Sequence, residues 1–383
     1  MIAFSQLPEL SLYVHLPWCL SKCPYCDFNS HESRNAIPEA AYVAALMRDL
    51  EDWLPMVWGR PVVTVFFGGG TPSLFSPQAI GEILSGIRSR LRLLPDAEIT
   101  LEANPGTFEA EKFAAFREAG VNRLSIGVQS FSDDSLRRLG RVHDGGQALS
   151  AIAHGVRIFD RINVDLMFGL PAQTIADAQD DLQRALDSGV RHLSCYQLTM
   201  EPGTRFAARP PVGLPDDDMV ADMHAGLIDR LAASGVGRYE ISAFASDGHQ
   251  CRHNLNYWSF GDYLGIGAGA HGKISSADRI LRTVRTRQPT AYMLDPTGHG
   301  TISPVAMDHL PFEFMLNALR LTSGVPASRW HHTTGTTVAG HAFLLERLAL
   351  AQDKGLLRRD PAVFQATPRG LELLNDLQAI FLP

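Results

Sequence analysis

Short apolar runs alternate with amphipathic stretches over the first 200 residues. Several of the runs are apolar almost throughout, which is typical of strands covered on both faces. The strand candidates span 11–16, 62–67, 98–103, 123–128, 161–170 and 192–198. Amphipathic stretches between them predict helices at 38–54, 77–91, 109–119, 145–159 and 174–188. This alternation predicts an α/β fold of parallel units, and six strands favour a partial (β/α)6 TIM-like barrel over a closed eight-stranded one.

The alternation weakens after about residue 200. A proline-rich loop at 209–218 ends in three aspartates, which predicts a helix running to about Ser234. A glycine-rich stretch follows at 261–272, and 289–304 has the composition of a linker. The tail from Asp308 predicts helices with one hairpin at 355–367, resembling a small, mainly helical winged-helix module. We therefore expect a barrel domain at 1–240, a connecting segment at 241–305 and a C-terminal domain at 306–383.

Composition narrows the classes of function. The chain has 383 residues, with 34 Lys and Arg against 41 Asp and Glu, giving a formal net charge of -7. That balance, without a basic stripe, argues against nucleic acid as a partner. No apolar run approaches the roughly 20 residues that span a bilayer, and the N-terminal stretch lacks the basic residues of a secretory signal. A cytoplasmic location is the expectation.

Three of the five cysteines lie within eight residues. Cys19, Cys23 and Cys26 are spaced C-x3-C-x2-C on one loop directly after the first predicted strand. Clustered thiols in a chain without a secretion signal indicate metal rather than disulfides. Four cysteines would saturate a [4Fe–4S] cube, whereas three leave one iron open to another ligand. The alternative is a structural zinc site with His15 as fourth ligand, although zinc ligands usually come as two separated pairs.

This spacing, with the aromatic Tyr25 before the third cysteine, resembles the signature of the radical S-adenosylmethionine (SAM) superfamily. The resemblance implies a [4Fe–4S] cluster whose open iron holds the methionine part of SAM. It also implies that an electron passed through the cluster can cleave SAM to a deoxyadenosyl radical. An electron donor such as flavodoxin or ferredoxin would then be a partner.

Polar residues and glycines recur at the ends of the predicted strands. Alone, each is more often structural than a ligand, but together they match the branch related to anaerobic coproporphyrinogen III oxidase. That resemblance implies a SAM site formed by Tyr13, Tyr25, Gly69, Gly70, Thr71, Glu102, Gln129, Arg141 and Asp165.

Two subfamilies of that branch differ at the loop that carries the three cysteines. The oxidases follow the third cysteine with another, as C-x-C, whereas Phe28 stands at that position here. The oxidases also carry additional sequence before the cysteine loop, whereas Cys19 lies near the start of this sequence. The segments CPYCDFNSH (23–31), RYEISAFA (238–245), CRHNLNYW (251–258), YLGIGAGAHG (263–272) and EFMLNALRL (313–321) resemble the HemW-type haem chaperones instead.

The segment from His253 to Trp258 is the candidate haem contact. An imidazole is a good axial ligand of haem iron, and aromatic rings can pack on a porphyrin face. The candidates are His253, Asn254, Tyr257 and Trp258. The alternative is a packed aromatic corner between domains. Cys251 is a second possible ligand, Cys195 is expected to be an inert core thiol, and Arg279, Arg282, Arg285 and Arg287 are expected to be solvated.

The resemblance implies a haem chaperone that carries a cluster and SAM and delivers haem to haem-accepting proteins, membrane-associated ones among the candidates. The rival expectation is an oxygen-independent coproporphyrinogen III oxidase. A radical SAM enzyme acting on another substrate is a third. Whether the chain is an enzyme stays open at this level.

Overall fold

The computed structural model describes residues 2–33, 35–298 and 300–383. Its main feature is one large mixed sheet, whose strands follow the order β14-β13-β12-β11-β1-β4-β5-β6-β7-β8-β10-β9. The strands from β11 to β8 run parallel to their neighbours, and those outside them pair antiparallel. Because all six predicted strands occur in sequence order within the parallel part, the α/β partial barrel is confirmed.

The parallel strands lie close to their predicted positions. They are β1 (Leu10–Leu16), β4 (Pro61–Gly69), β5 (Arg92–Ala103), β6 (Arg123–Gln129), β7 (Arg161–Phe168), β8 (His192–Gln197) and β11 (Asp262–Ile266). The remaining strands of the large sheet are β9 (Gly237–Arg238), β10 (Ala243–Ala245), β12 (His271–Ser276), β13 (Arg279–Val284) and β14 (Thr301–Pro304).

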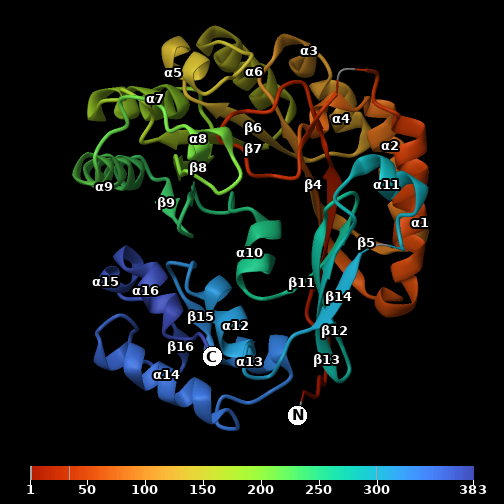
Figure 1. Ribbon diagram of the computed structural model, residues 1–383, viewed down its shortest axis with the longest axis vertical. Coiled ribbons are helices and arrows are strands. Elements are labelled where there is room, and N and C mark those ends of the chain that lie inside the picture. Colours follow the sequence, from red (N-terminus) through yellow and green to blue (C-terminus); the bar gives the residue numbers. More distant parts are fainter. Residues whose placement is uncertain (1, 34, 299) are drawn as a thin grey trace.

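Helices cover the outer face of the sheet (Figure 1). They are α1 (Glu39–Val57), α2 (Pro77–Arg90), α3 (Thr107–Ala110), α4 (Phe113–Ala119), α5 (Asp133–Arg138), α6 (Gly145–Ile158), α7 (Ile175–Asp187) and α9 (Asp217–Ala233). The short helix α8 (Arg205–Ala208) lies instead beside the cysteine loop, where the amide of Phe206 donates to the carbonyl of Pro24. A 3-10 helix, η1 (Pro72–Leu74), follows β4. Several begin with a side-chain cap, as where Asp144 and Gln147 form a capping box at α6.

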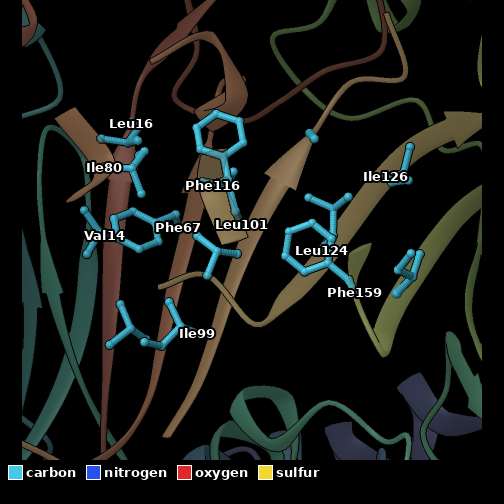
Figure 2. Close-up of a cluster of buried hydrophobic side chains, with 14 of the residues drawn as sticks. Val14, Leu16, Phe67, Ile80, Ile99, Leu101, Phe116, Leu124, Ile126 and Phe159 are labelled. Carbon is cyan, nitrogen blue, oxygen red and sulfur yellow. The ribbon is translucent and has the colours of Figure 1, made fainter. Parts of the chain in front are cut away.

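The strands alternate rather than being apolar on both faces. Val14, Phe67, Leu101 and Leu124 point toward the helices and form the main core (Figure 2). The residues between them, such as Thr64 and Ser125, face the barrel interior and are buried polar groups. The expectation that helices cover both faces of these strands was therefore wrong for the inner face, which is polar and surrounds cavities.

The stretch after residue 240 contributes strands to the sheet. β11, in the glycine-rich stretch, pairs parallel with β1. The stretch expected to be a linker contains α11 (Pro289–Leu294) and β14, which pairs with β13. That expectation was wrong, because the proline at 289 starts a helix and the other residues complete a β-meander.

The C-terminal helices form a separate group with their own apolar core (Figure 1). They are α12 (Leu310–Ala318), α13 (Ala327–Thr334), α14 (Ala342–Asp353), α15 (Pro368–Glu372) and α16 (Leu374–Ala379). The short strands β15 (Val325–Pro326) and β16 (Val363–Phe364) pair antiparallel. Within the expected hairpin, Leu357 and Ala366 form a single antiparallel bridge. The helix α10 (Arg252–Trp258) lies between this group and the barrel.

Candidate functional site

The cysteine loop is closed by a short parallel pair of strands, β2 (Trp18–Cys19) and β3 (His31–Glu32). Cys19 is buried, and Cys23 and Cys26 are half-buried. The amide of Cys26 donates to the carbonyl of Cys23 at 3.1 Å, which holds the two cysteines on one turn. Burial raises the pKa of the Cys19 thiol to about 11, so a cation is needed for this residue to act as a thiolate near neutral pH.

The surroundings of the loop fit an iron–sulfur cluster better than a single zinc ion. Both ring nitrogens of His15 are engaged, Nδ1 with the Tyr13 hydroxyl at 3.0 Å and Nε2 with the Asn29 carbonyl at 2.9 Å. In the described part of the chain, no three His, Cys, Asp or Glu side chains converge as ligands of one ion would. The three thiols nevertheless line one pocket, which suits a larger group held at three corners.

That pocket, which we call the cluster pocket, also gathers most of the residues expected to hold SAM. They are Tyr25, Gly69, Gly70, Thr71, Glu102, Gln129, Arg141 and Asp165. Tyr13 is not among its lining residues and faces an adjoining cavity instead. Parallel strands β4, β5, β6 and β7 bring these side chains together because their carboxyl ends meet at one rim of the barrel.

The glycines after β4 are required by close approach to the cysteine loop. A Cβ on Gly70 would lie 2.4 Å from the carbonyl oxygen of Trp18. The amides of Gly70 and Thr71 donate to the carbonyls of Leu16 and Trp18 at 2.9 and 2.7 Å. The glycine segment therefore docks directly on the chain that carries the first cysteine.

Two carboxyl groups line the cluster pocket near each other. Burial, with a smaller effect from nearby Asp165, raises the pKa of Glu102 to about 8. The amide of Gly69 donates to Glu102 at 3.3 Å. Burial also raises the pKa of Asp165, although the Asn163 amide donates to it at 2.7 Å. A cationic amine or ribose hydroxyls placed between them would compensate this buried acidity.

Arg141 and Gln129 complete the rim. Arg141 donates to Asn104 Oδ1 and to the Gly127 carbonyl, both at 2.7 Å, and its guanidinium also lies 3.7 Å from the Cys23 sulfur. Gln129 has a φ of 71°, a left-handed conformation that is uncommon for a residue with a side chain and often marks a functional site. Arg141 therefore places a guanidinium, the group best suited to pair with a carboxylate, beside the cysteine loop.

Three lining residues were not among the sequence-based candidates. Asn104 lines the cluster pocket, binds both Arg141 and Thr71, and follows directly after β5. Ser125 is a polar residue inside an apolar strand. Asn29 binds the carbonyls of Ala268 and Arg287, each at 2.9 Å, and so ties the cysteine loop to the turns at either end of the β12–β13 hairpin. A polar residue just past or within an apolar strand was the available signal for the first two.

A second cavity, the histidine cavity, adjoins the cluster pocket. His253, Asn254 and Tyr257 line it, and Phe28 and Glu102 are shared with the cluster pocket, but Trp258 does not line it. The Trp258 ring packs toward the C-terminal core, where the Arg320 guanidinium stacks 4.2 Å from it. The structure thus places Trp258 outside this cavity, although its ring packs edge-on against that of Tyr257 with the centroids 4.6 Å apart.

Within residues 2–33, 35–298 and 300–383, the hydrogen bonds of His253 leave one ring nitrogen without a partner. Its Nδ1 lies 2.8 Å from Thr64 Oγ1, and that hydroxyl donates to Ser11 Oγ at 2.8 Å. Because the Thr64 proton is committed to Ser11, His253 Nδ1–H donates to Thr64, which leaves the Nε2 lone pair free. Burial lowers the pKa of His253 to about 4, so the ring is neutral at physiological pH. A neutral imidazole with an anchored Nδ1–H is suited to ligate iron through Nε2.

The two remaining cysteines, Cys251 and Cys195, are not among the residues that line the histidine cavity. Cys251 is fully buried, donates to Glu98 and has its pKa raised to about 12 by burial. Cys195 is a buried core thiol, as the sequence indicated.

The four arginines near the β12–β13 hairpin differ from one another. Arg285 is buried against Asp49 at 2.5 Å, contrary to the expectation of a solvated residue. Arg282 is half-buried and pairs with Glu313. Arg279 pairs with exposed Asp278, and Arg287 is exposed at the mouth of the histidine cavity.

A third cavity, the barrel cavity, lies in the barrel interior and adjoins the cluster pocket. Its polar wall includes Arg123, Asn163, His192 and Ser194. It shares Phe28 and Glu102 with both other cavities and Asn254 with the histidine cavity. The three cavities are therefore neighbours around one aromatic residue of the cysteine loop.

Comparisons with known proteins agree with these features. Residues 13–185 match the Radical SAM superfamily, and residues 305–373 match the HemN C-terminal domain. The heme chaperone HemW of Escherichia coli is 47% identical over 380 residues, covering 98% of this chain and 99% of that protein. The chain belongs to the HemW family.

More distant relatives extend the comparison. The HemW heme chaperone of Bacillus subtilis is 34% identical over 97% of this chain and 99% of that protein. The mitochondrial radical S-adenosyl methionine domain-containing protein 1 of Mus musculus is 38% identical over 99% of this chain and 88% of that protein. The solved structure of the radical SAM enzyme coproporphyrinogen III oxidase (HemN) from Escherichia coli superposes with a TM-score of 0.82 at 25% identity, covering 98% of this chain and 90% of that one. In the described residues, no helix is long and apolar enough to cross a membrane.

Proposed function

We propose that this chain binds haem and transfers it to haem-accepting proteins, with a [4Fe–4S] cluster on Cys19, Cys23 and Cys26 and SAM beside it. The observation that carries the proposal is His253, whose Nδ1 is anchored on Thr64 and whose Nε2 is free at a cavity next to the cluster pocket. The names of the full-length HemW relatives support the same reading.

The chain's own residues have distinct parts in this proposal. Cys19, Cys23 and Cys26 would hold the [4Fe–4S] cluster, which would supply the electron for cleavage of SAM. Glu102 and Asp165 would hold the cationic and hydroxyl groups of SAM, and Arg141 would pair with its carboxylate. Thr64 keeps the His253 ring in the tautomer that binds iron, while Asn254 and Tyr257 border the porphyrin.

A haem titration of the anaerobically reconstituted protein tests the proposal. We expect a saturable Soret band at about one haem per chain, and we expect His253→Ala to weaken binding by roughly tenfold or more because the axial ligand is lost. His271→Ala is the matched control, since His271 is an exposed histidine at the same cavity. Iron content and the thermal midpoint are measured alongside to show that His253→Ala keeps its cluster and fold. Unchanged haem affinity in a folded His253→Ala protein would remove this ligand from the proposal.

The second candidate function is oxidative decarboxylation of coproporphyrinogen III. The superposition on coproporphyrinogen III oxidase favours it, and Phe28 at the position of the oxidases' additional cysteine argues against it. We expect no protoporphyrinogen when the reconstituted protein is incubated anaerobically with coproporphyrinogen III, SAM and reductant. Formation of that product would replace the chaperone proposal with the enzyme.

A further inference from the structure

Arg123 is a buried cation in the wall of the barrel cavity. It begins β6, points into the barrel interior, and its residue is only 2% exposed. Among the described residues, no carboxylate lies within ion-pair distance of Arg123, and its guanidinium makes no hydrogen bond. A buried guanidinium without a counter-charge is costly, and proteins normally pair such groups.

The carboxyl groups nearest to Arg123 along the barrel wall already have partners. Glu98 pairs with Arg161 at 3.3 Å and accepts from the amide of His253 at 3.1 Å. Asp165 accepts from Asn163 at 2.7 Å. Neither carboxyl is free to turn toward Arg123 without giving up these contacts.

The other polar groups of the wall are also committed to one another. His192 Nδ1 donates to Asn163 Oδ1 at 2.6 Å, and Ser194 donates to the same oxygen at 3.0 Å. His192 Nε2 accepts from the Tyr239 hydroxyl at 2.8 Å. Because burial keeps the His192 pKa well below its usual value, the ring is neutral and adds no charge. Among the described residues, Arg123 therefore has no direct ion pair or hydrogen bond in this wall, and Glu98 and Asp165 favour its charge only from a distance.

The barrel cavity adjoins the proposed haem site. Asn254 lines both cavities, and the Phe66 ring, which lines the barrel cavity, lies 5.0 Å from the His253 ring. A ligand bound to His253 can thus reach the barrel cavity past Asn254. Haem carries two propionates, whose carboxylates match the planar fork of a guanidinium.

We infer that the barrel cavity is a carboxylate site, in which Arg123 pairs with a propionate of the tetrapyrrole bound at the histidine cavity. This inference rests on the proposed haem binding and assigns the part of the ligand that enters the barrel. It makes Arg123 a determinant of which tetrapyrroles the chain accepts, since a ligand without a free carboxylate leaves the buried cation unpaired.

Paired titrations with haem and haem dimethyl ester, in the same detergent-containing buffer with SAM present, test the inference. We expect the wild-type protein to bind haem about tenfold or more tightly than the ester, because the ester cannot form the charged pair. In Arg123→Gln the affinity for haem should fall to that for the ester, which should change little. Arg287→Gln is the matched control, since Arg287 is an exposed arginine at the histidine cavity, and it should keep the wild-type ratio.

The outcomes separate the two proposals. Equal wild-type affinities for haem and its ester would overturn the carboxylate site and leave haem binding intact, and this comparison does not depend on whether Arg123→Gln folds. The carboxylate site would also be overturned if Arg287→Gln lost the preference for haem over the ester while Arg123→Gln kept it. The propionate would then lie at Arg287 in the histidine cavity. A wild-type protein that binds neither ligand would overturn the proposed function and this inference together.

Discussion

At the scale of single residues, the cysteine loop is positioned by contacts that leave no room for side chains. Gly70 lies against the Trp18 carbonyl, and its amide bonds to Leu16. A methyl group at this position meets backbone rather than a flexible side chain, so the loop or the strand end must move. The geometry of the first cysteine thus depends on a residue that offers no chemistry of its own.

Gly70→Ala should therefore lower cluster occupancy. We expect a destabilisation of about 1–3 kcal/mol from the forced displacement, with less iron bound per chain after reconstitution. Gly237→Ala is the control, because nothing lies within 4 Å of a Cβ built there. Iron content and the urea midpoint measure the two effects. Wild-type iron content in Gly70→Ala would show that the close approach does not govern the loop.

Sequence pattern predicted the site residues unevenly for a physical reason. Motif spacing and strand-end position indicated Cys19, Glu102 and Arg141, because chain order and strand direction bring such residues to one rim. The position of Trp258 outside the histidine cavity, which Tyr257 lines, could not be foreseen. On a short helix, adjacent residues point about 100° apart, so one faces a cavity while the next faces the C-terminal core.

At the scale of elements, periodicity located the parallel strands but missed β11 and β14. β11 consists of DYLGI, where small and polar residues hide the apolar pattern, and its partner β1 lies some 250 residues earlier in the chain. β14 is an exposed strand of four residues, so neither burial nor length marks it. Local sequence patterns do not predict strands whose pairing depends on distant parts of the chain.

The connection between α5 and α6 contains a buried histidine whose titration should be visible in stability. His143 donates from Nε2 to the Val128 carbonyl at 3.1 Å. Burial and the nearby Arg141 lower its pKa to about 4, against a usual value of 6.5. As the pH falls, the unfolded chain binds the proton at a higher pH than the folded chain does. The stabilising effect of the neutral His143 ring is therefore present above about pH 6.5 and is lost as the pH falls toward 4.

His143→Gln should remove that pH dependence while an amide can still bind Val128. Between pH 7.5 and 5, the free energy of unfolding of the wild type should fall relative to His143→Gln by about 1–2 kcal/mol. Exposed His154→Gln should follow the wild type. Urea unfolding at several pH values measures this, and parallel curves for wild type and His143→Gln would contradict the burial of a neutral ring.

At the scale of the whole molecule, two apolar cores are joined by chain segments from far apart in the sequence. Ile2 belongs to the C-terminal core, and the amide of Ala3 donates to the Gly335 carbonyl at 2.9 Å. Arg320 of the C-terminal group pairs with Glu240 of the barrel at 3.0 Å and stacks on Trp258. The C-terminal helices are thus held from both ends of the barrel domain.

Ile2→Ala should loosen the C-terminal group selectively. Truncating this buried side chain is expected to cost about 2 kcal/mol or more. Amide hydrogen exchange should accelerate in 310–381 and stay unchanged in the strands β4 to β6. Val212→Ala, at a position 94% exposed, is the control. Uniform acceleration across both cores would mean that they unfold as one unit.

The pairing of β1 with β11 has a consequence for biosynthesis. The cysteine loop is synthesised well before the segment that holds it, because Asn29 bonds to the carbonyls of Ala268 and Arg287, which come much later in the chain. At about 5–20 residues per second, the loop waits for tens of seconds before the segment that fixes it has been made. The proposed cluster would therefore be loaded late, after translation has passed the last strands of the barrel, even though the three cysteines are synthesised earlier.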